Sequence, residues 1–253
     1  MPLYKTQAIV VNSVNFGEAN RILTLYTFKF GKIQAVVKGI RKIKSRFGSS
    51  MELFTNCTLM LYRKEGKELY TVTQVEVINS LRFLKENLKK MVFGSYILEI
   101  LLHFVPAEEK NEELYNLLIK TLINIEKKDY VEKIALTFAI QLLSIAGYKM
   151  RTDVCVICKT KPLDKGSLGL SYVFGGILCA KCSLNDEEAL SISQDIFKTI
   201  KNVYKANIDT ENSMNTNTDL TMETILLLNV FFENIVERKF KVPAVLKKLA
   251  IAF

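Results

Sequence analysis

Four cysteines are spaced as two CxxC pairs, Cys155 with Cys158 and Cys179 with Cys182, and twenty residues separate the pairs. This spacing is typical of two short knuckles that hold one Zn²⁺ ion between four thiolates. Four protein ligands leave no open position for water, so we expect one structural zinc rather than a catalytic one. Four thiolates around a divalent ion carry a net negative charge, which neighbouring lysines offset. These lysines are Lys159, Lys161, Lys165 and Lys181.

A second group of residues suited to binding is a run of five cations within residues 38–46. Single-stranded nucleic acids bind to cationic grooves that follow the phosphates and to aromatic rings that stack on the bases. The run is flanked by Phe47, which we expect to be exposed, and is extended by Arg21 and Lys32. An ordinary solvated hairpin is the alternative, but no acidic residue compensates the run. The predicted nucleic-acid contacts are Lys38, Arg41, Lys42, Lys44, Arg46, Arg21, Lys32 and Phe47.

Other cations and aromatic residues of the first eighty positions are weaker candidates. Arg63, Lys64 and Lys67 can extend the cationic groove. Further stacking candidates are Phe16, Tyr26, Phe28, Phe30 and Tyr70, although alternation on a small barrel buries about half of such side chains.

The sequence lacks the motifs of nucleotide hydrolysis and of common catalytic sites. It has neither GxxxxGK[ST] nor GxGxxG, and its single histidine, His103, lies in an apolar helical segment. A zinc deaminase is excluded because neither CxxC pair follows a proline. We therefore expect a protein that is not an enzyme and that acts on nucleic acid through binding energy alone.

Charge and cysteine usage indicate where the chain works. The first 80 residues carry 12 Lys plus Arg against 5 Asp plus Glu, so 7 of the whole-chain surplus of 9 positive charges lie there. Cysteines in metal spacing, with Cys57 left over in an apolar run, fit a reducing compartment. No signal peptide and no stretch long enough for a membrane span are evident. We expect a cytoplasmic, nucleoid-associated protein with no membrane contact.

The cations must be positioned by β-structure. In the first 80 residues, inward-facing and outward-facing side chains alternate with a period of 2, and Val, Ile, Thr and Tyr are frequent. Five short strands joined by long loops favour an oligonucleotide/oligosaccharide-binding (OB) barrel. The strands are expected over residues 6–14, 20–28, 32–38, 53–62 and 69–78.

From about residue 81 the apolar residues recur with a period of 3.6, which predicts helices. One helix is expected over 84–105, ended by Pro106. A second is expected around residues 114–125, and a third, around residues 134–145, stops at Gly147. Ser193 is a candidate N-cap of a later helix. The polar stretch 207–219 is interpreted as an exposed or disordered loop, and another helix follows over 221–238. The fold class is therefore α+β, an N-terminal five-stranded OB-fold barrel followed by an α-helical domain with an inserted four-cysteine zinc-knuckle unit. The expected domains are 1–80 (barrel), 81–150 with 186–253 (helical) and 151–185 (zinc insertion).

This order of parts resembles the RecO family of bacterial recombination and repair mediators. The matching segments are residues 6–10, the GEANRILTL segment 17–25, Gly31, the KGIRK to Ser45 loop, and the two CxxC pairs. The resemblance implies that the loop from Lys38 to Arg46 contacts single-stranded and double-stranded DNA and that the four cysteines bind Zn²⁺.

The family also implies an activity and partners. Its members anneal complementary strands, including strands coated by single-strand-binding protein (SSB), and act with RecR to load the recombinase RecA. The SSB C-terminal tail is expected to bind the helical domain, where Lys89, Lys90, Lys127, Lys128 and Lys133 are candidate contacts. Two alternatives remain open from the residues themselves: a zinc-stabilised RNA-binding or ribosome-associated barrel, and a non-catalytic protein adaptor.

Overall fold

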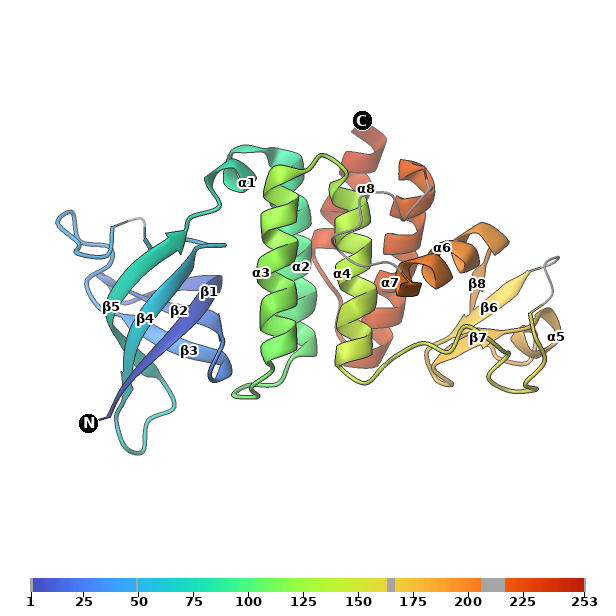
Figure 1. The fold of residues 1–253 in the computed structure, drawn as a ribbon, viewed down its shortest axis with the longest axis horizontal. Helices are drawn as coiled ribbons and strands as arrows, with labels where there is room; N and C mark the ends of the chain where they lie inside the picture. The colour runs from blue at the N-terminus through green and yellow to red at the C-terminus, as the bar shows by residue number, and fades with distance from the viewer. Residues whose placement is uncertain (1, 49, 163–166, 206–216, 253) are drawn as a thin grey trace. The chain divides into compact units, whose positions relative to one another are not determined.

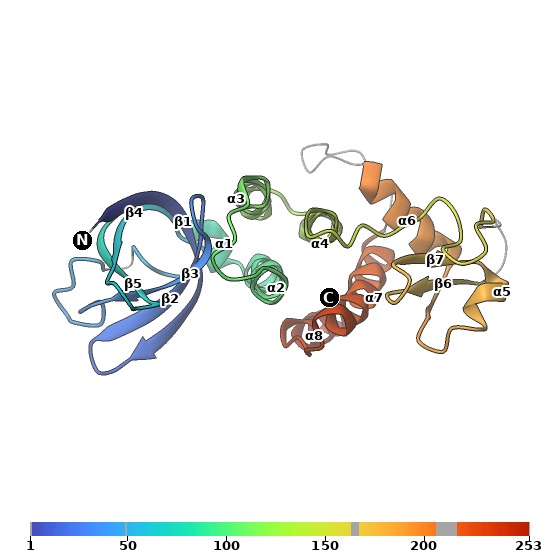
Figure 2. The same ribbon diagram turned by 90° about the horizontal axis from the view of Figure 1, so that it is seen from below.

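The computed structural model describes residues 2–48, 50–162, 167–205 and 217–252 (Figures 1 and 2). The chain forms two compact units. The first unit contains Met1–Gly94 and Leu101–Lys128, and the second contains Ser95–Ile100 and Asp129–Phe253.

The first unit contains a closed five-stranded barrel. Its strands are β1 (Leu3–Phe16), β2 (Asn20–Thr27), β3 (Gly31–Val37), β4 (Asn56–Arg63) and β5 (Tyr70–Asn79). They close in the order β1-β2-β3-β5-β4, with β3 and β5 parallel and the other pairs antiparallel. The expected α+β fold with an N-terminal OB-like barrel is confirmed.

Alternation along the strands explains why this part of the chain forms a barrel. On β3, Ile33, Ala35 and Val37 are buried in the barrel core, while Gln34 between them is exposed. Side chains of a strand point to opposite faces in turn, so a period of 2 supplies one apolar face for the core.

The long connection 38–55 between β3 and β4 closes one part of the barrel core. It contributes Ile40, Phe47 and Met51 to the same buried cluster as the strands. Phe54 is also buried and has a left-handed backbone (φ 68°). Because a left-handed residue cannot continue a strand, β4 begins at Asn56 rather than at residue 53 as expected.

The helix expected over 84–105 is two helices, α1 (Arg82–Glu86) and α2 (Leu88–Phe104). Asn87 separates them in an extended conformation, and its side chain accepts a hydrogen bond from the backbone N–H of Lys90. This N-cap starts a new helix, a role that favours Asn. Pro106 acts as expected, because Val105 before it is already extended. Helix α3 (Glu112–Lys127) follows.

The second unit holds helices α4 (Val131–Ile145), α6 (Gln194–Lys205), α7 (Thr218–Val236) and α8 (Val242–Ala252). Ser193 is confirmed as an N-cap, because its Oγ accepts from the N–H of Ile196 at 3.2 Å. The sequence did not indicate α8, whose first N–H groups are capped from a distance: the carboxylate of Glu99 accepts from Lys241 and Val242.

The polar stretch 207–219 is only partly described. Residues 206–216 lie outside the described residues. Asn217 caps α7 by accepting from the N–H of Leu220 at 2.7 Å, so the last residues of the stretch start a helix instead of extending a loop.

The metal-ligand region contains a small sheet that the sequence did not predict. Its strands are β6 (Leu168–Ser171), β7 (Gly176–Leu178) and β8 (Leu190–Ile192), in the order β7-β6-β8. Helix α5 (Ala180–Ser183) packs against β6 and β7 (Figure 2). Among the described residues, no helix is both long enough and apolar enough to cross a membrane.

A glycine at the start of β3 tests how closely the backbone of Glu109 packs against the barrel. Gly31 has a φ of +62°, and a Cβ there would lie 1.9 Å from the carbonyl oxygen of Glu109. We predict that Gly31→Ala lowers the free energy of unfolding by about 2–4 kcal/mol, because a left-handed alanine is strained and the backbone must move. The control Gly66→Ala has a similar φ of +70° but open space around it, and should lose only about 1 kcal/mol. Urea denaturation measures both, and equal losses would contradict the packing described.

Candidate nucleic-acid interface and metal centre

The five predicted cations of residues 38–46, which we call the cationic loop, lie on one exposed connection. Lys38, Arg41, Lys42, Lys44 and Arg46 all have exposed side chains. Ile43, at the centre of the run, is fully exposed as well. The structure therefore brings together the cations that the sequence grouped.

Hydrogen bonds attach the cationic loop to the turn between β1 and β2. The N–H of Gly39 donates to Asn20 Oδ1 at 2.9 Å, and the N–H of Arg41 donates to the carbonyl of Ala19 at 3.1 Å. The Arg41 guanidinium also donates to the carbonyl of Gly17. These bonds hold the base of the loop in one conformation and leave its other cations directed to solvent.

The expectation that Phe47 is exposed is wrong. Only 3% of its surface is accessible, and its ring belongs to the barrel core. The Arg46 guanidinium covers the ring at 4.8 Å from its centroid. The physical reason is that the strands leave apolar core surface uncovered at this end, and burying a phenylalanine there is favourable.

Phe16 is the exposed aromatic residue that lies near the cationic loop. Half of its surface is accessible. It pairs in register with Asn20, whose side chain accepts the hydrogen bond from Gly39. The sequence named Phe16 only among several stacking candidates; of these, Tyr26 and Tyr70 are buried. Phe16 is distinguished by its exposure and by the hydrogen bonds that join its hairpin turn to Gly39 and Arg41, about twenty residues further along the chain.

The two cations predicted outside the loop have different surroundings. Arg21 on β2 pairs with Val37, directly before the cationic loop. Lys32 lies at the other end of β3, and its ammonium donates to the carbonyl of Leu102 at 2.7 Å. Lys32 therefore caps the C-terminal end of α2 and is not grouped with the loop.

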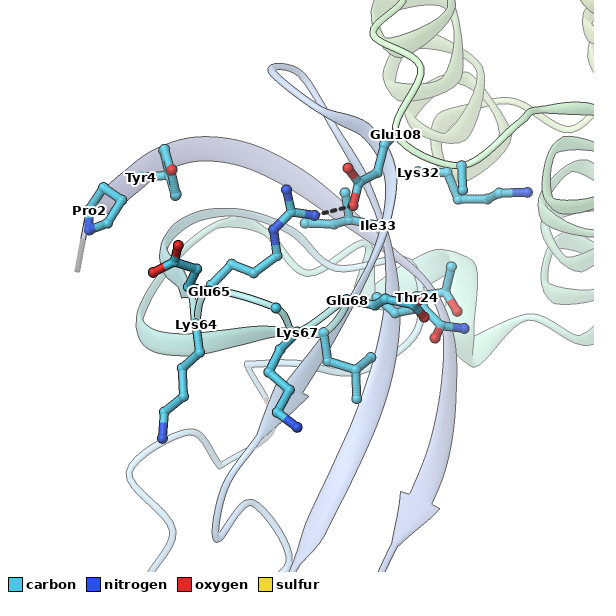
Figure 3. A pocket seen from close by; sticks show the side chains of 15 residues that line it. Pro2, Tyr4, Thr24, Lys32, Ile33, Lys64, Glu65, Lys67, Glu68 and Glu108 are labelled. Carbon is cyan, nitrogen blue, oxygen red and sulfur yellow. Dashed lines mark hydrogen bonds and ion pairs between the residues drawn. The ribbon is translucent and has the colours of Figure 1, made fainter.

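A cavity of about 1240 Å³ lies on the barrel between β3, the β4–β5 loop and residues 107–108 (Figure 3). Its cations alternate with the carboxylates of Glu65, Glu68 and Glu108. Arg63 pairs with Glu108 at 2.6 Å, while Lys64 and Lys67 point away from Glu108. This mixture of charges makes the cavity a poorer phosphate site than the cationic loop.

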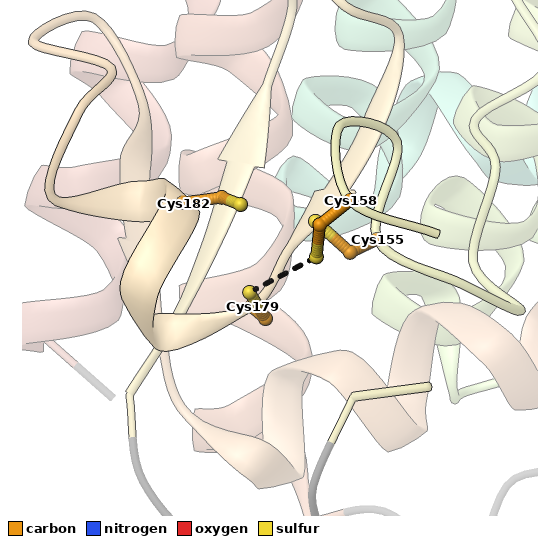
Figure 4. A group of neighbouring side chains, drawn as sticks. All are labelled: Cys155, Cys158, Cys179 and Cys182. Carbon is orange, nitrogen blue, oxygen red and sulfur yellow. Dashed lines mark hydrogen bonds between the residues drawn. The ribbon is translucent and has the colours of Figure 1, made fainter. Parts of the chain in front are cut away.

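The four cysteines of the two CxxC pairs converge in the second unit (Figure 4). Their Sγ atoms all lie within 4.8 Å of one another, and the Sγ atoms of Cys158 and Cys179 are 3.6 Å apart. A tetrahedral ion with metal–sulfur bonds of about 2.3 Å needs sulfurs about 3.8 Å apart. The four thiols therefore fit one metal ion.

Local backbone bonds form each knuckle. In the first, the N–H of Cys155 donates to the carbonyl of Thr160, and the N–H of Lys159 donates back to Cys155. Lys159 adopts a left-handed φ of 62°, which turns the chain back after Cys158. In the second, Cys179 precedes α5, which carries Cys182.

The thiols differ in acidity in the absence of metal. Hydrogen bonds from Thr160 lower the pKa of Cys158 to about 6, whereas burial raises the pKa of Cys182 to about 12. Lys159, Lys161 and Lys181 are exposed beside the ligands, and Lys165 lies outside the described residues. Cys57 is buried as expected, and burial raises its pKa to about 12, so it is inert.

The four thiols lead to a prediction about metal content and pH. We expect one divalent ion per chain, lost in the double variant Cys155→Ser/Cys179→Ser and retained in Cys57→Ser. Binding must displace thiol protons, so the apparent affinity should fall by at least about tenfold per pH unit as the pH is lowered from 8 to 6. Competition with a chromophoric chelator measures this, and an affinity independent of pH would contradict thiolate ligation.

Comparisons with known proteins agree with this arrangement. A family model described as "Recombination protein O N terminal" matches residues 1–81, and one described as "Recombination protein O C terminal" matches residues 85–244. The "DNA repair protein RecO" of Symbiobacterium thermophilum is 30% identical over 243 residues, covering 95% of each chain. That of Dehalococcoides mccartyi is 31% identical over 238 residues, covering 94% of this chain and 92% of its own. The chain therefore belongs to the RecO family.

Proposed function

We propose that this protein binds single-stranded DNA through the cationic loop and anneals complementary strands during recombinational DNA repair, without hydrolysing a nucleotide. The observation that carries the proposal is the set of five exposed cations on one loop whose neighbouring apolar residues are fixed in the barrel core.

The mechanism follows from electrostatics. Lys38, Arg41, Lys42, Lys44 and Arg46 neutralise phosphates and release the counterions condensed on the strand. Two complementary strands repel each other less when their phosphates are neutralised, so pairing becomes faster without any input of chemical energy. Double-stranded DNA binds to the same cations.

Aromatic stacking adds a contact that does not depend on base sequence. Phe16 replaces Phe47 as the proposed stacking residue, because it is exposed and lies next to the turn that holds the loop. Arg21 extends the phosphate contacts at the end of β2. Lys32 is not included, since its ammonium bonds the end of α2.

The metal in the second unit is proposed to be Zn²⁺ with a structural role. Cys155, Cys158, Cys179 and Cys182 would hold it with no ligand position left for substrate. A bound ion would join the two knuckles, which the chain places beside the short strands β6, β7 and β8. The protein is accordingly proposed not to be an enzyme.

Family membership supports the proposed partners. These are RecR, the C-terminal tail of SSB and, indirectly, RecA, which the protein would help to load on SSB-coated DNA. The tail is acidic, so lysines of the helical part of the chain remain candidate contacts. They are Lys89, Lys90, Lys127, Lys128 and Lys133, of which Lys90 already donates to the carbonyl of Glu126. Cytoplasmic, nucleoid-associated localisation follows from these partners.

The salt dependence of DNA binding tests the role of the loop. If about five phosphates are contacted, log K should fall with log salt with a slope of roughly −3.5. Replacing the five loop cations by alanine should remove most of this slope and weaken binding to oligo(dT) at least about 100-fold at 0.1 M salt. Fluorescence anisotropy measures both.

A matched control removes five exposed cations of the second unit: Lys198, Arg238, Lys239, Lys241 and Lys247. It changes the net charge equally and should retain the slope and most of the affinity. Equal losses in the two variants would mean that only net charge matters. Preference for RNA over matched single-stranded DNA in competition would favour the RNA-binding alternative.

The stacking role of Phe16 gives a separate prediction. Phe16→Ala should weaken oligo(dT) binding by about 1 kcal/mol or more, since base–aromatic stacking contributes about 1–3 kcal/mol per base. The fold should be unaffected, because half of the ring is already in solvent. Phe83→Ala removes a comparably exposed ring on α1 and serves as the control. An unchanged affinity in Phe16→Ala would show that this ring does not stack.

A further inference from the structure

A second cavity, of about 500 Å³, lies within the second unit and belongs to neither site described above. Four parts of the chain surround it: residues 147–151 after α4, the first cysteine knuckle, the turn between β6 and β7, and one side of α7. Its volume falls within the range of ordinary ligand sites.

The described residues that line this cavity include cations but no carboxylate. The cations are Lys149, Arg151 and Lys159. Within the described part of the chain, the side chains of Lys149 and Arg151 are exposed and form no ion pair or hydrogen bond. Lys159 bonds the carbonyl of Val156 and lies beside the metal ligands, so Lys149 and Arg151 carry the argument.

Exposed aromatic rings accompany these cations. Tyr148 is 49% exposed and Phe174 is 55% exposed, although both line the cavity. Buried Phe231 of α7 supplies an apolar part of the lining. Tyr172 also lines it, but its hydroxyl bonds Glu188, which raises the Tyr172 pKa. Exposed apolar surface gathered at one place marks sites that contact a ligand or a partner.

The backbone around the cavity is held by hydrogen bonds. The N–H of Arg151 donates to Gly175, and its carbonyl accepts from Ile177. The N–H of Val156 in the knuckle donates to the carbonyl of Ile177. Gly176 permits this close approach, because a Cβ there would lie 2.5 Å from the carbonyl oxygen of Arg151. The cations and rings therefore stand on a fixed support.

We propose that this cavity is a second binding site for single-stranded DNA, in which a base stacks on Phe174 or Tyr148 and the adjoining phosphates contact Lys149 and Arg151. Cations with no partner beside exposed aromatic rings are the combination by which proteins bind single strands without sequence preference. The inference rests on the proposed function and deepens it: with one site on the barrel and another on the second unit, a single chain can hold two strands.

The chain contains no tryptophan, so a single one can report on this cavity. The experiment uses the full-length, metal-loaded protein with the five loop cations replaced by alanine and with Phe174→Trp. Oligo(dT) should quench the tryptophan fluorescence saturably, because stacked bases quench indole. Adding Lys149→Ala and Arg151→Ala should weaken the quenching about 20-fold at 0.1 M salt, as expected for two lost phosphate contacts.

Two controls make the result specific. Lys198→Ala with Arg238→Ala removes two exposed cations of the same unit outside the cavity and should leave the quenching unchanged. Phe83→Trp, on the first unit, should not be quenched in the loop variant. Tyr148→Trp repeats the measurement if Phe174→Trp does not fold.

The possible results are distinct. Absence of quenching in folded, metal-loaded protein would overturn the proposal. Quenching by an acidic peptide with a C-terminal phenylalanine, but not by oligo(dT), would also overturn it and assign the cavity to a protein partner. The proposed function is tested separately, by the loss of DNA affinity in the loop variant without tryptophan, so failure of either claim can be recognised.

Discussion

The cationic loop depends on one constraint: the connection between β3 and β4 must seal the barrel core. Ile40, Phe47 and Met51 enter the core from this connection, and each such burial contributes about 1.5–3 kcal/mol. The cations stand next to these anchors in the sequence, Arg41 after Ile40 and Arg46 before Phe47. When these apolar side chains pack into the core, the cations beside them in the sequence point to solvent. A preformed loop loses less conformational entropy when DNA binds.

Patterns in the sequence predicted the features that depend on interactions between residues close together in the chain. Alternation along β3 predicted the barrel, and the spacing of Cys155, Cys158, Cys179 and Cys182 predicted a cluster that could hold a metal ion, because strand period and knuckle geometry are set within a few residues. The burial of Phe47 was missed, since its partners come from other strands. Strands β6, β7 and β8 were missed because three or four residues are too few to show a period. Helix α8 was missed because its cap, Glu99, lies far away in the sequence.

The two units use different means to fix the exposed residues that we propose to bind DNA. In the first, apolar side chains of the barrel core hold the loop. In the second, the strands β6, β7 and β8 are short, and Cys155 and Cys182 are buried in one cluster with Leu178 of β7. A metal ion bound to the four thiols would stabilise this small unit, because the ligands are brought together only in the folded state. The cavity beside the first knuckle shares this support.

Strand annealing on coated DNA tests the central claim most directly. Two complementary dye-labelled strands are each saturated with SSB, and duplex formation is followed after adding the protein without any nucleotide. The account predicts rapid annealing that slows with added salt and that falls at least about tenfold when the five loop cations are replaced by alanine. A requirement for nucleotide, or annealing by the loop variant at the rate of the unaltered protein, would contradict it.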